Sequence, residues 1–267
     1  MITGIVSLQL MQFFMNVDSV SGTFGTMKKI AQIMDTDSEP DGGEPVPEVC
    51  ADIEFDNVSF AYAGGQDVIK NLSVKIPMGK VTAVIGGNGA GKSTLFKLLL
   101  RLYEPKSGEI RFGGDGIGKY SLTDWRDRFA VVPQRNPLIG GTVRENIAYG
   151  LDREVSDEEL AETARRANFS GGQGQCISIA RAMLRNADYL LLDEATSNLD
   201  VVSEAEVTGA MDELMRDKTT IMIAHNYAAT RNADYIIVMK DGAVEAAGTP
   251  DELLKTNEYY KMFVKTL

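Results

Sequence analysis

The chain has 267 residues, of which 44% are hydrophobic and 24% are charged, and this balance predicts a packed core and excludes wholesale disorder. The net charge of -11 argues against non-specific nucleic-acid binding, because that binding needs Lys and Arg to neutralise phosphates. With two distant cysteines, Cys50 and Cys176, and a single histidine, His225, the sequence excludes a disulfide framework and a multi-histidine metal site.

The first segment, Met1 to Val17, carries no charged residue. It is shorter than the roughly 20 apolar residues of a full bilayer span, and it has neither the basic start nor the cleavage site of a secretory signal. From the residues alone it is either the end of a transmembrane helix or an amphipathic helix packed on a soluble core. Residues 35–50, rich in proline, glycine and acidic side chains, predict a linker and a domain boundary.

Strand and helix patterns alternate after the linker. Alternating apolar residues predict strands over residues 53–60, with a break at Asp56-Asn57, and over residues 72–76. Continuous apolar runs, which are typical of parallel strands buried on both faces, cover residues 81–85, 129–132, 189–192, 220–223 and 235–239. Helical patterns cover residues 93–102, 157–167, 173–185 and 204–216. This order predicts an α/β domain with helices on both sides of the sheet.

A glycine-rich turn follows the predicted strand over residues 81–85 and opens the next helix. It fits the pattern GxxxxGK[ST] with the residues Gly86, Gly87, Asn88, Gly89, Ala90, Gly91, Lys92 and Ser93. The glycines let successive backbone N–H groups point at phosphate oxygens, and the start of the helix adds a favourable dipole. Lys92 would lie against the β- and γ-phosphates and the Ser93 hydroxyl would bind Mg²⁺, so the turn predicts a nucleoside triphosphate site.

Two acids end the apolar strand predicted over residues 189–192. An ionised carboxylate at the end of a buried strand is costly unless it meets a cation, which predicts that Asp193 holds Mg²⁺. Glu194 follows it and could act as the general base that polarises the attacking water.

With both motifs in place, further residues resemble those of the ATP-binding cassette (ABC) ATPases. The decisive match is the signature sequence at the start of a predicted helix, made of Ser170, Gly171, Gly172 and Gln173. Tyr62 resembles the aromatic residue that stacks on adenine, and Gln134 resembles the Q-loop glutamine. His225 resembles the switch histidine that contacts the γ-phosphate, and residues 197–200 resemble the D-loop that ends at Asp200.

The resemblance implies an α/β fold with a P-loop NTPase (RecA-like) core, an antiparallel β subdomain around Tyr62 and a shortened α-helical subdomain. It implies that ATP is bound by Tyr62, Gly86, Asn88, Gly89, Ala90, Gly91, Lys92, Ser93 and Thr94. It further implies that Ser93, Gln134 and Asp193 hold Mg²⁺, and that Glu194, Gln134 and His225 serve hydrolysis. The signature residues would face ATP bound to a partner chain.

The resemblance also implies partners and a location. Two nucleotide-binding domains of this family sandwich ATP head to tail, as a homodimer or a heterodimer, and a transmembrane domain supplies the transport path. Residues 1–34 would then be the end of the last transmembrane helix with its cytoplasmic extension, residues 35–50 the linker, and residues 51–267 the nucleotide-binding domain at the cytoplasmic side of the cell membrane. The function implied is ATP hydrolysis that powers export, with no nucleic acid as partner. Alternatives are an ATP-dependent dimerisation module or a soluble ABC ATPase without transport coupling.

The sequence departs from the exporter pattern between Gln134 and Ser170. The 35 residues in this interval are fewer than exporters place there, because a further helix and a coupling segment before the signature are missing. The short interval is either a true deletion or a stretch absent from the sequence. Phe169 stands in place of the usual leucine of the signature, and Cys176 in place of the usual arginine; we expect a buried thiol there without a catalytic role.

Overall fold

The computed structural model describes residues 24, 27–32, 34–35, 39, 42–167, 174–194 and 201–265, the backbone alone for residues 201–206. The chain forms two compact units, Met1–Asp41 and Gly42–Leu267. In the first unit residues 27–32 are helical and exposed, whereas the predicted membrane segment Met1 to Val17 lies outside the described residues. Across the part of the chain that the structure describes, no helix has both the length and the apolar character needed to span a bilayer.

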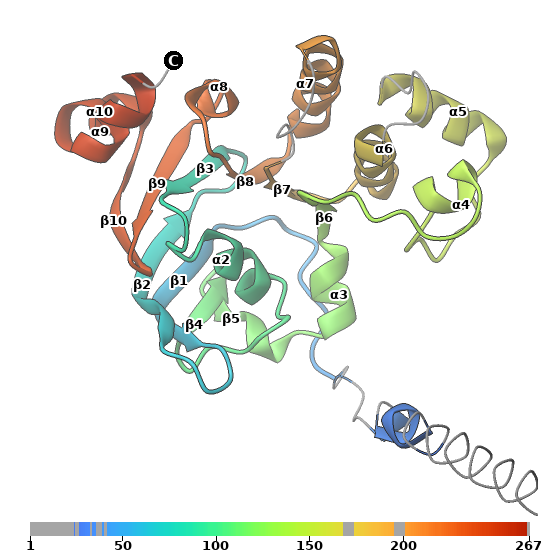
Figure 1. Ribbon diagram of the computed structural model, residues 1–267, viewed down its shortest axis with the longest axis horizontal. Helices are drawn as coiled ribbons and strands as arrows, with labels where there is room; N and C mark the ends of the chain where they lie inside the picture. The colour runs from blue at the N-terminus through green and yellow to red at the C-terminus, as the bar shows by residue number, and fades with distance from the viewer. Residues whose placement is uncertain are drawn as a thin grey trace, which may run out of the picture. The chain divides into compact units, whose positions relative to one another are not determined.

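A six-stranded sheet forms the centre of the second unit, in the order β10-β9-β3-β8-β7-β6 (Figure 1). Its strands are β3 (Val81–Gly86), β6 (Phe129–Val132), β7 (Tyr189–Asp193), β8 (Thr219–Ile223), β9 (Tyr235–Lys240) and β10 (Ala243–Gly248). All neighbours are parallel except β9 and β10, which are antiparallel. The five strands predicted from continuous apolar runs are confirmed to within one residue at each end, and β10 is an addition to them.

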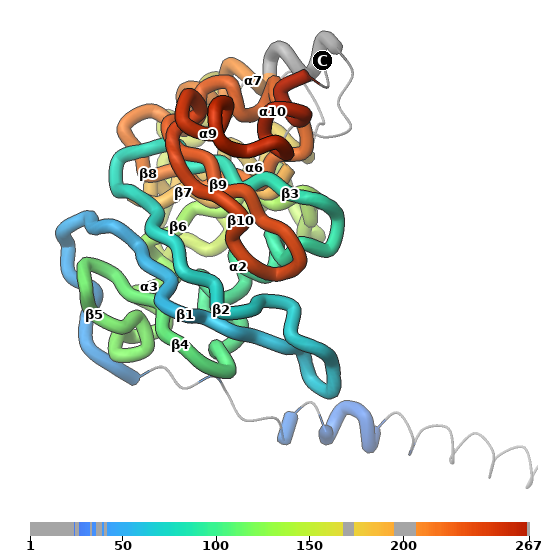
Figure 2. Tube along the Cα trace, turned by 90° about the vertical axis from the view of Figure 1, so that its left-hand side faces the viewer, coloured from blue at the N-terminus to red at the C-terminus, as the bar shows by residue number. Residues whose placement is uncertain are grey.

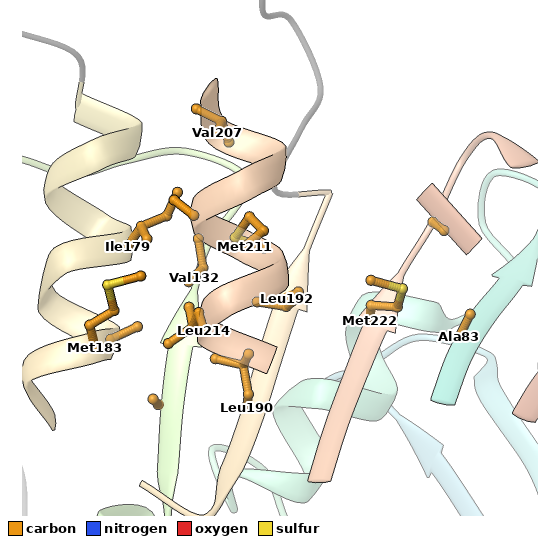
Figure 3. Packing of buried hydrophobic residues seen from close by; sticks show 14 of the residues in the cluster. Ala83, Val132, Ile179, Met183, Leu190, Leu192, Val207, Met211, Leu214 and Met222 are labelled. Carbon is orange, nitrogen blue, oxygen red and sulfur yellow. The ribbon is translucent and has the colours of Figure 1, made fainter. Parts of the chain in front are cut away.

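Successive residues of these strands alternate between two hydrophobic cores. One face, which includes Ile85, Leu190 and Leu192, packs in one core with α6 (Gly174–Arg185) and α7 (Val201–Met215). Figure 3 shows this core, with Ile179 and Met183 of α6 and Met211 and Leu214 of α7 beside Val132, Leu190 and Leu192 of the strands. The other face, which includes Val84 and Leu191, packs in a second core with α2 (Lys92–Leu99). The predicted coverage of the sheet by helices on both faces is therefore confirmed, and it explains why the runs are almost entirely apolar, with Thr82 and Thr220 as buried polar exceptions.

A second, antiparallel sheet adjoins α2 and has the order β2-β1-β4-β5. Its strands are β1 (Ile53–Ala61), β2 (Asp67–Ile76), β4 (Ser107–Phe112) and β5 (Asp115–Gly116). Figure 2 shows it at the opposite end of the unit from α9 (Pro250–Thr256) and α10 (Glu258–Lys265). The break that the sequence predicts at Asp56-Asn57 is confirmed as a register shift between Phe55 and Val58, with Asn57 at a φ of 50°, and β1 continues through it.

The helix predicted over residues 93–102 is wrong about where the helix ends. α2 stops at Leu99, and Arg101 takes a left-handed φ of 52°. The N–H of Arg101 donates to Leu98 O and the N–H of Leu102 donates to Lys97 O, the paired bonds that close a helix in the Schellman motif. Apolar residues continue beyond the stop, and for this reason the pattern overshoots.

Short helices complete the unit: η1 (Ile117–Lys119), α3 (Leu122–Asp127), α4 (Val143–Ile147), α5 (Asp157–Arg166) and α8 (Tyr227–Thr230). α4 and α5 both contact α6 and together make the shortened helical portion that the sequence predicts between Gln134 and the signature. Cys176 is buried in α6, as expected. Residues 168–173, where this interval meets the signature, lie outside the described residues.

The second half of the predicted linker is part of the second unit. Glu44 forms a parallel bridge with Tyr120, in which its N–H donates to Lys119 O and its carbonyl accepts from the N–H of Ser121. Gly43 lies so close to this turn that a Cβ would meet the Tyr120 carbonyl carbon at 2.6 Å, so glycine is required there. The Tyr189 hydroxyl, farther along, donates to Ala51 O at 2.6 Å and accepts from Ala51 N at 2.9 Å.

Candidate functional site

The glycine-rich turn connects β3 to α2 at the carboxyl edge of the six-stranded sheet. Gly86 has a φ of 150°, and a Cβ there would lie 2.2 Å from Met239 O, so no side chain fits between the turn and β9. Gly87, Asn88 and Gly89 are exposed, whereas Ala90, Gly91 and Lys92 are buried. The exposed backbone of the turn therefore stands at the start of α2, the geometry expected of an anion-binding loop.

Lys92 lies under this turn with its side chain 6% exposed. Its Nζ donates to the carbonyl oxygens of Gly86 and Gly87 at 2.8 and 3.1 Å. Burial lowers the pKa of Lys92, while the nearby charges of Glu194 and Asp193 counteract that shift. An anion bound on the turn would compensate this partly desolvated ammonium group, so the local electrostatics favour a phosphate ligand.

Asp193 is aligned across the sheet with a residue near the end of β3. In the sheet register it pairs with Ile223 of β8, and Ile223 pairs with Val84 of β3, two residues before the turn. Burial, with a further contribution from the Glu194 charge, raises the pKa of Asp193. Among the described residues, its Oδ1 is buried and has no hydrogen-bond partner. A buried carboxylate oxygen without a partner fits the expectation of a bound cation.

Glu194 occupies the next position and is turned out of the strand by a left-handed φ of 49°. Its Oε2 accepts a hydrogen bond of 2.6 Å from Nε2 of Gln134, and its Oε1 pairs with Nε2 of His225. The Glu194 side chain is 19% exposed and that of His225 is 40% exposed. Glu194, predicted from the strand-end acids, therefore meets Gln134 and His225, predicted from the family resemblance, at the carboxyl edge of β6, β7 and β8.

Tyr62 lies at the end of β1 beside α2. Its hydroxyl is 3.1 Å from Thr94 Oγ1 and accepts a hydrogen bond of 3.3 Å from Lys97 Nζ. Tyr62 and Gly89 both line a pocket of about 680 Å³, which also has Gly65, Gln66, Asp67, Val68, Lys70 and Asp241 in its wall. The structure therefore brings the predicted base-stacking residue and the glycine-rich turn to a single pocket.

Residues 69–197 match the sequence model of the family described as ABC transporter. This range holds the glycine-rich turn, Gln134, the signature sequence and both strand-end acids. The chain contains a domain of the ABC transporter family.

Similar proteins of the ABC transporter family agree with this assignment. The chain is 38% identical over 258 residues to an "ATP-dependent lipid A-core flippase" of Escherichia coli K12, and 38% identical over 257 residues to the flippase of the same name in Salmonella paratyphi A. Both matches cover 87% of this chain and 44% of the flippase. A solved structure of a bacterial Atm1-family ABC exporter with ATP bound matches with a TM-score of 0.79 and 29% identity, over 89% of this chain and 46% of the exporter. The chain thus spans about half the length of the relatives it matches.

The flippase match also shows a difference in length within the matched region. It is 258 residues long, whereas 87% of 267 residues is about 232, so about 26 flippase positions have no counterpart in this chain.

Two of the predicted motifs cannot be placed. Signature residues Ser170 to Gln173 and D-loop residues 197–200 lie outside the described residues, although α6 begins at Gly174, immediately after the signature. Near that start, Asn136 Nδ2 donates to Gln175 Oε1 at 2.6 Å. The sequence analysis missed this bond and the Lys97–Tyr62 contact. The position of Lys97, one helical turn after Ser93, is the signal that could have indicated the second.

Proposed function

We propose that this chain binds ATP with Mg²⁺ and hydrolyses it. The observation that carries the proposal is the placement of Glu194, whose carboxylate is held between Gln134 and His225 at the sheet edge that also bears the glycine-rich turn. In this arrangement Glu194 accepts a proton from the attacking water. His225 contacts the γ-phosphate and, together with Gln134, fixes the orientation of the Glu194 carboxylate.

The triphosphate is bound by the residues of the turn and the first turn of α2. The backbone of the turn, exposed at Gly87, Asn88 and Gly89, offers N–H groups to phosphate oxygens, and the N-terminus of α2 adds its positive dipole end. Lys92 exchanges its bonds to two backbone carbonyls for bonds to the phosphates, while Thr94 supplies a hydroxyl. Tyr62 provides an aromatic face for the adenine in the pocket that it shares with Gly89.

The residues present fit a magnesium ion. Asp193 has a buried carboxylate oxygen without a partner among the described residues, and the Ser93 and Gln134 side chains offer further oxygen ligands. Bound Mg²⁺ neutralises charge on the phosphates during transfer. Burial at the strand end disfavours the ionised form of Asp193, and a bound cation would offset that cost.

We further propose that two such domains form an ATP sandwich and that the domain works with a transmembrane domain in export. The signature residues, just before α6, would contact ATP of the partner domain through N–H groups at the start of that helix. The similarity to a flippase and to an exporter supports this assignment, as does the chain's coverage of about half of each. The domain would then lie at the cytoplasmic side of a cell membrane.

A second candidate function is an ATP-dependent dimerisation module without transport coupling. The observation that favours it is the short interval between Gln134 and Ser170, in a chain that lacks about 26 flippase positions over the matched region. Lys92, Asp193, Glu194 and His225 are all present, so the short interval leaves the residues proposed for ATP binding and hydrolysis in place.

The test compares phosphate release from ATP by the chain and by Glu194→Gln, with Glu245→Gln, an exposed residue of β10, as the matched control. Turnover by the chain and the control but not by Glu194→Gln supports the enzyme. Equal phosphate release from all three contradicts it. ATP-dependent dimers without turnover in any of them, measured by light scattering, support the dimerisation module instead.

A further inference from the structure

Tyr62 belongs to an aromatic cluster with a lysine over it. Its ring centroid lies 4.9 Å from that of Phe60 and 5.2 Å from that of Tyr103, and both contacts are edge-to-face. Lys97 Nζ lies 5.3 Å from the Tyr62 centroid and 6.0 Å from the Tyr103 centroid. Phe60 is buried, while Tyr103 is 42% exposed and Tyr62 is half-buried.

The hydroxyl of Tyr62 is bound at the same time by two positions of α2. Thr94 Oγ1 lies 3.1 Å from it, and Lys97 Nζ donates to it at 3.3 Å. Thr94 and Lys97 are three residues apart and so lie on one face of the helix. Since α2 begins at the glycine-rich turn, this contact fixes the tyrosine to the element that carries the phosphate-binding residues.

We propose that Lys97 is a positioning residue for the nucleotide base. It holds the Tyr62 ring in a fixed position relative to the glycine-rich turn. The ring that receives the base and the turn that receives the triphosphate are then both in place before the nucleotide binds. The proposal rests on the proposed function, because it assumes that Tyr62 receives the base. A ring that is already fixed avoids the cost of ordering it on binding, and therefore increases affinity without a contact between Lys97 and the ligand.

A different role for the same lysine must be separated from this one. The positive charge of Lys97 also lowers the pKa of Asp193, so it is felt at the predicted magnesium site and could attract phosphates directly. Inorganic tripolyphosphate separates the two roles, because it has the phosphates of ATP and no base. A positioning role affects ATP alone, whereas a charge effect acts on both ligands.

The experiment measures the binding of MgATP and of magnesium tripolyphosphate by calorimetry to the full chain, Lys97→Met and Lys97→Arg. The matched control is Lys80→Met, an exposed lysine just before β3, at the opposite end of that strand from the turn. We expect Lys97→Met to weaken ATP binding about three- to tenfold, the range of a cation–π contact and a weak hydrogen bond, and to leave tripolyphosphate binding unchanged. Lys97→Arg, which keeps the cation over the ring, should restore most of the affinity.

Tyr62→Phe keeps the ring and removes the bonded hydroxyl, which gives a second measurement should Lys97→Met fold poorly by circular dichroism. It should reproduce the loss that is selective for ATP, and Lys97→Met in the Tyr62→Phe background should then add less than it does alone. Equal losses for both ligands, or no loss for ATP, would overturn the proposal. Failure of the proposed function looks different, because the unaltered chain would then not bind ATP.

Discussion

The side-chain amide of Gln134 donates a hydrogen bond of 2.6 Å to the carboxylate of Glu194, which joins the loop after β6 to the end of β7. The two strands are neighbours in the sheet, with Val132 paired to Leu192. The bond uses one Glu194 oxygen and leaves His225 to contact the other. The Glu194 carboxylate, which we propose as the general base, is therefore held by two side chains from outside its own strand.

Replacing Gln134 should slow hydrolysis more than it weakens binding. In Gln134→Ala the Glu194 carboxylate loses one of its two constraints, and we expect turnover to fall about tenfold while ATP affinity changes less, because positioning acts on the chemical step. Phosphate release at saturating ATP and the dissociation constant from calorimetry check this. Gln134→Glu, which places two carboxylates together, should lower turnover further; an unchanged rate in both variants would contradict the assignment.

Lys92→Ala should abolish tight ATP binding. The variant removes the buried ammonium group and leaves the Gly86 and Gly87 carbonyls without their donor. A charged hydrogen bond contributes about 1.5–3 kcal/mol, so we expect affinity to fall about 10- to 100-fold. Calorimetry with MgATP measures it, and Lys80→Ala provides a lysine deletion far from the turn. Equal affinity of the two variants for ATP would refute the phosphate role of the glycine-rich turn.

Asp193→Asn should stabilise the free protein and abolish its stabilisation by MgATP. Burial raises the pKa of Asp193, which means that its ionised form is disfavoured in the folded protein, and its Oδ1 has no partner among the described residues. The neutral amide removes that cost, and a gain of 1 kcal/mol corresponds to a rise of about 2–4 °C in Tm for a domain of this size. Thermal unfolding with and without MgATP checks both effects. Asp152→Asn, an exposed position, should change neither; a lower Tm for Asp193→Asn would argue against the unsatisfied carboxylate.

Tyr189 should make stability depend on pH in the alkaline range. Burial raises the pKa of Tyr189 to about 12, against about 10 for an exposed tyrosine. The folded state therefore holds the phenol proton more tightly than the unfolded state, and the free energy of unfolding decreases as the pH rises from about 10 towards 12. Tyr189→Phe lacks this titration but also loses the two bonds to Ala51. It should therefore be less stable than the unaltered chain at pH 8, and its free energy of unfolding should depend less on pH above pH 10. Urea unfolding at pH 8 and above pH 10 measures the difference in the free energy of unfolding. The control is Tyr149→Phe, because Tyr149 is 57% exposed. Parallel curves for the chain and Tyr189→Phe would contradict the expectation.

The parallel core could be predicted from the sequence, because strands buried on both faces leave continuous apolar runs such as residues 189–192. Strands that are not buried on both faces could not be predicted in this way. β4 has an exposed first half, with Ile110 and Phe112 as its buried residues, and β10 is bounded by a turn and has few large side chains. Their partners are distant in sequence, so local pattern is weak evidence for them.

The candidate site was predictable where one motif carries one chemical role. The glycine-rich turn and the strand-end acids have fixed spacings, whereas the meeting of Gln134 and His225 on Glu194 depends on the order of strands in the sheet. The Lys97–Tyr62 contact depends on side-chain directions across two elements, so the position of Lys97 one helical turn after Ser93 is only a weak signal for it. The placement of the signature residues stays a prediction.

The bridge between Glu44 and Tyr120 determines where mechanical force enters the second unit. A pull on the chain before Gly42 is first resisted by backbone bonds to the turn at Lys119–Ser121, which packs with the antiparallel layer. The strand end that carries Asp193 and Glu194 lies in the other sheet. A pull on the chain before Gly42 would therefore break the backbone bonds of Glu44 before it displaced these two carboxylates.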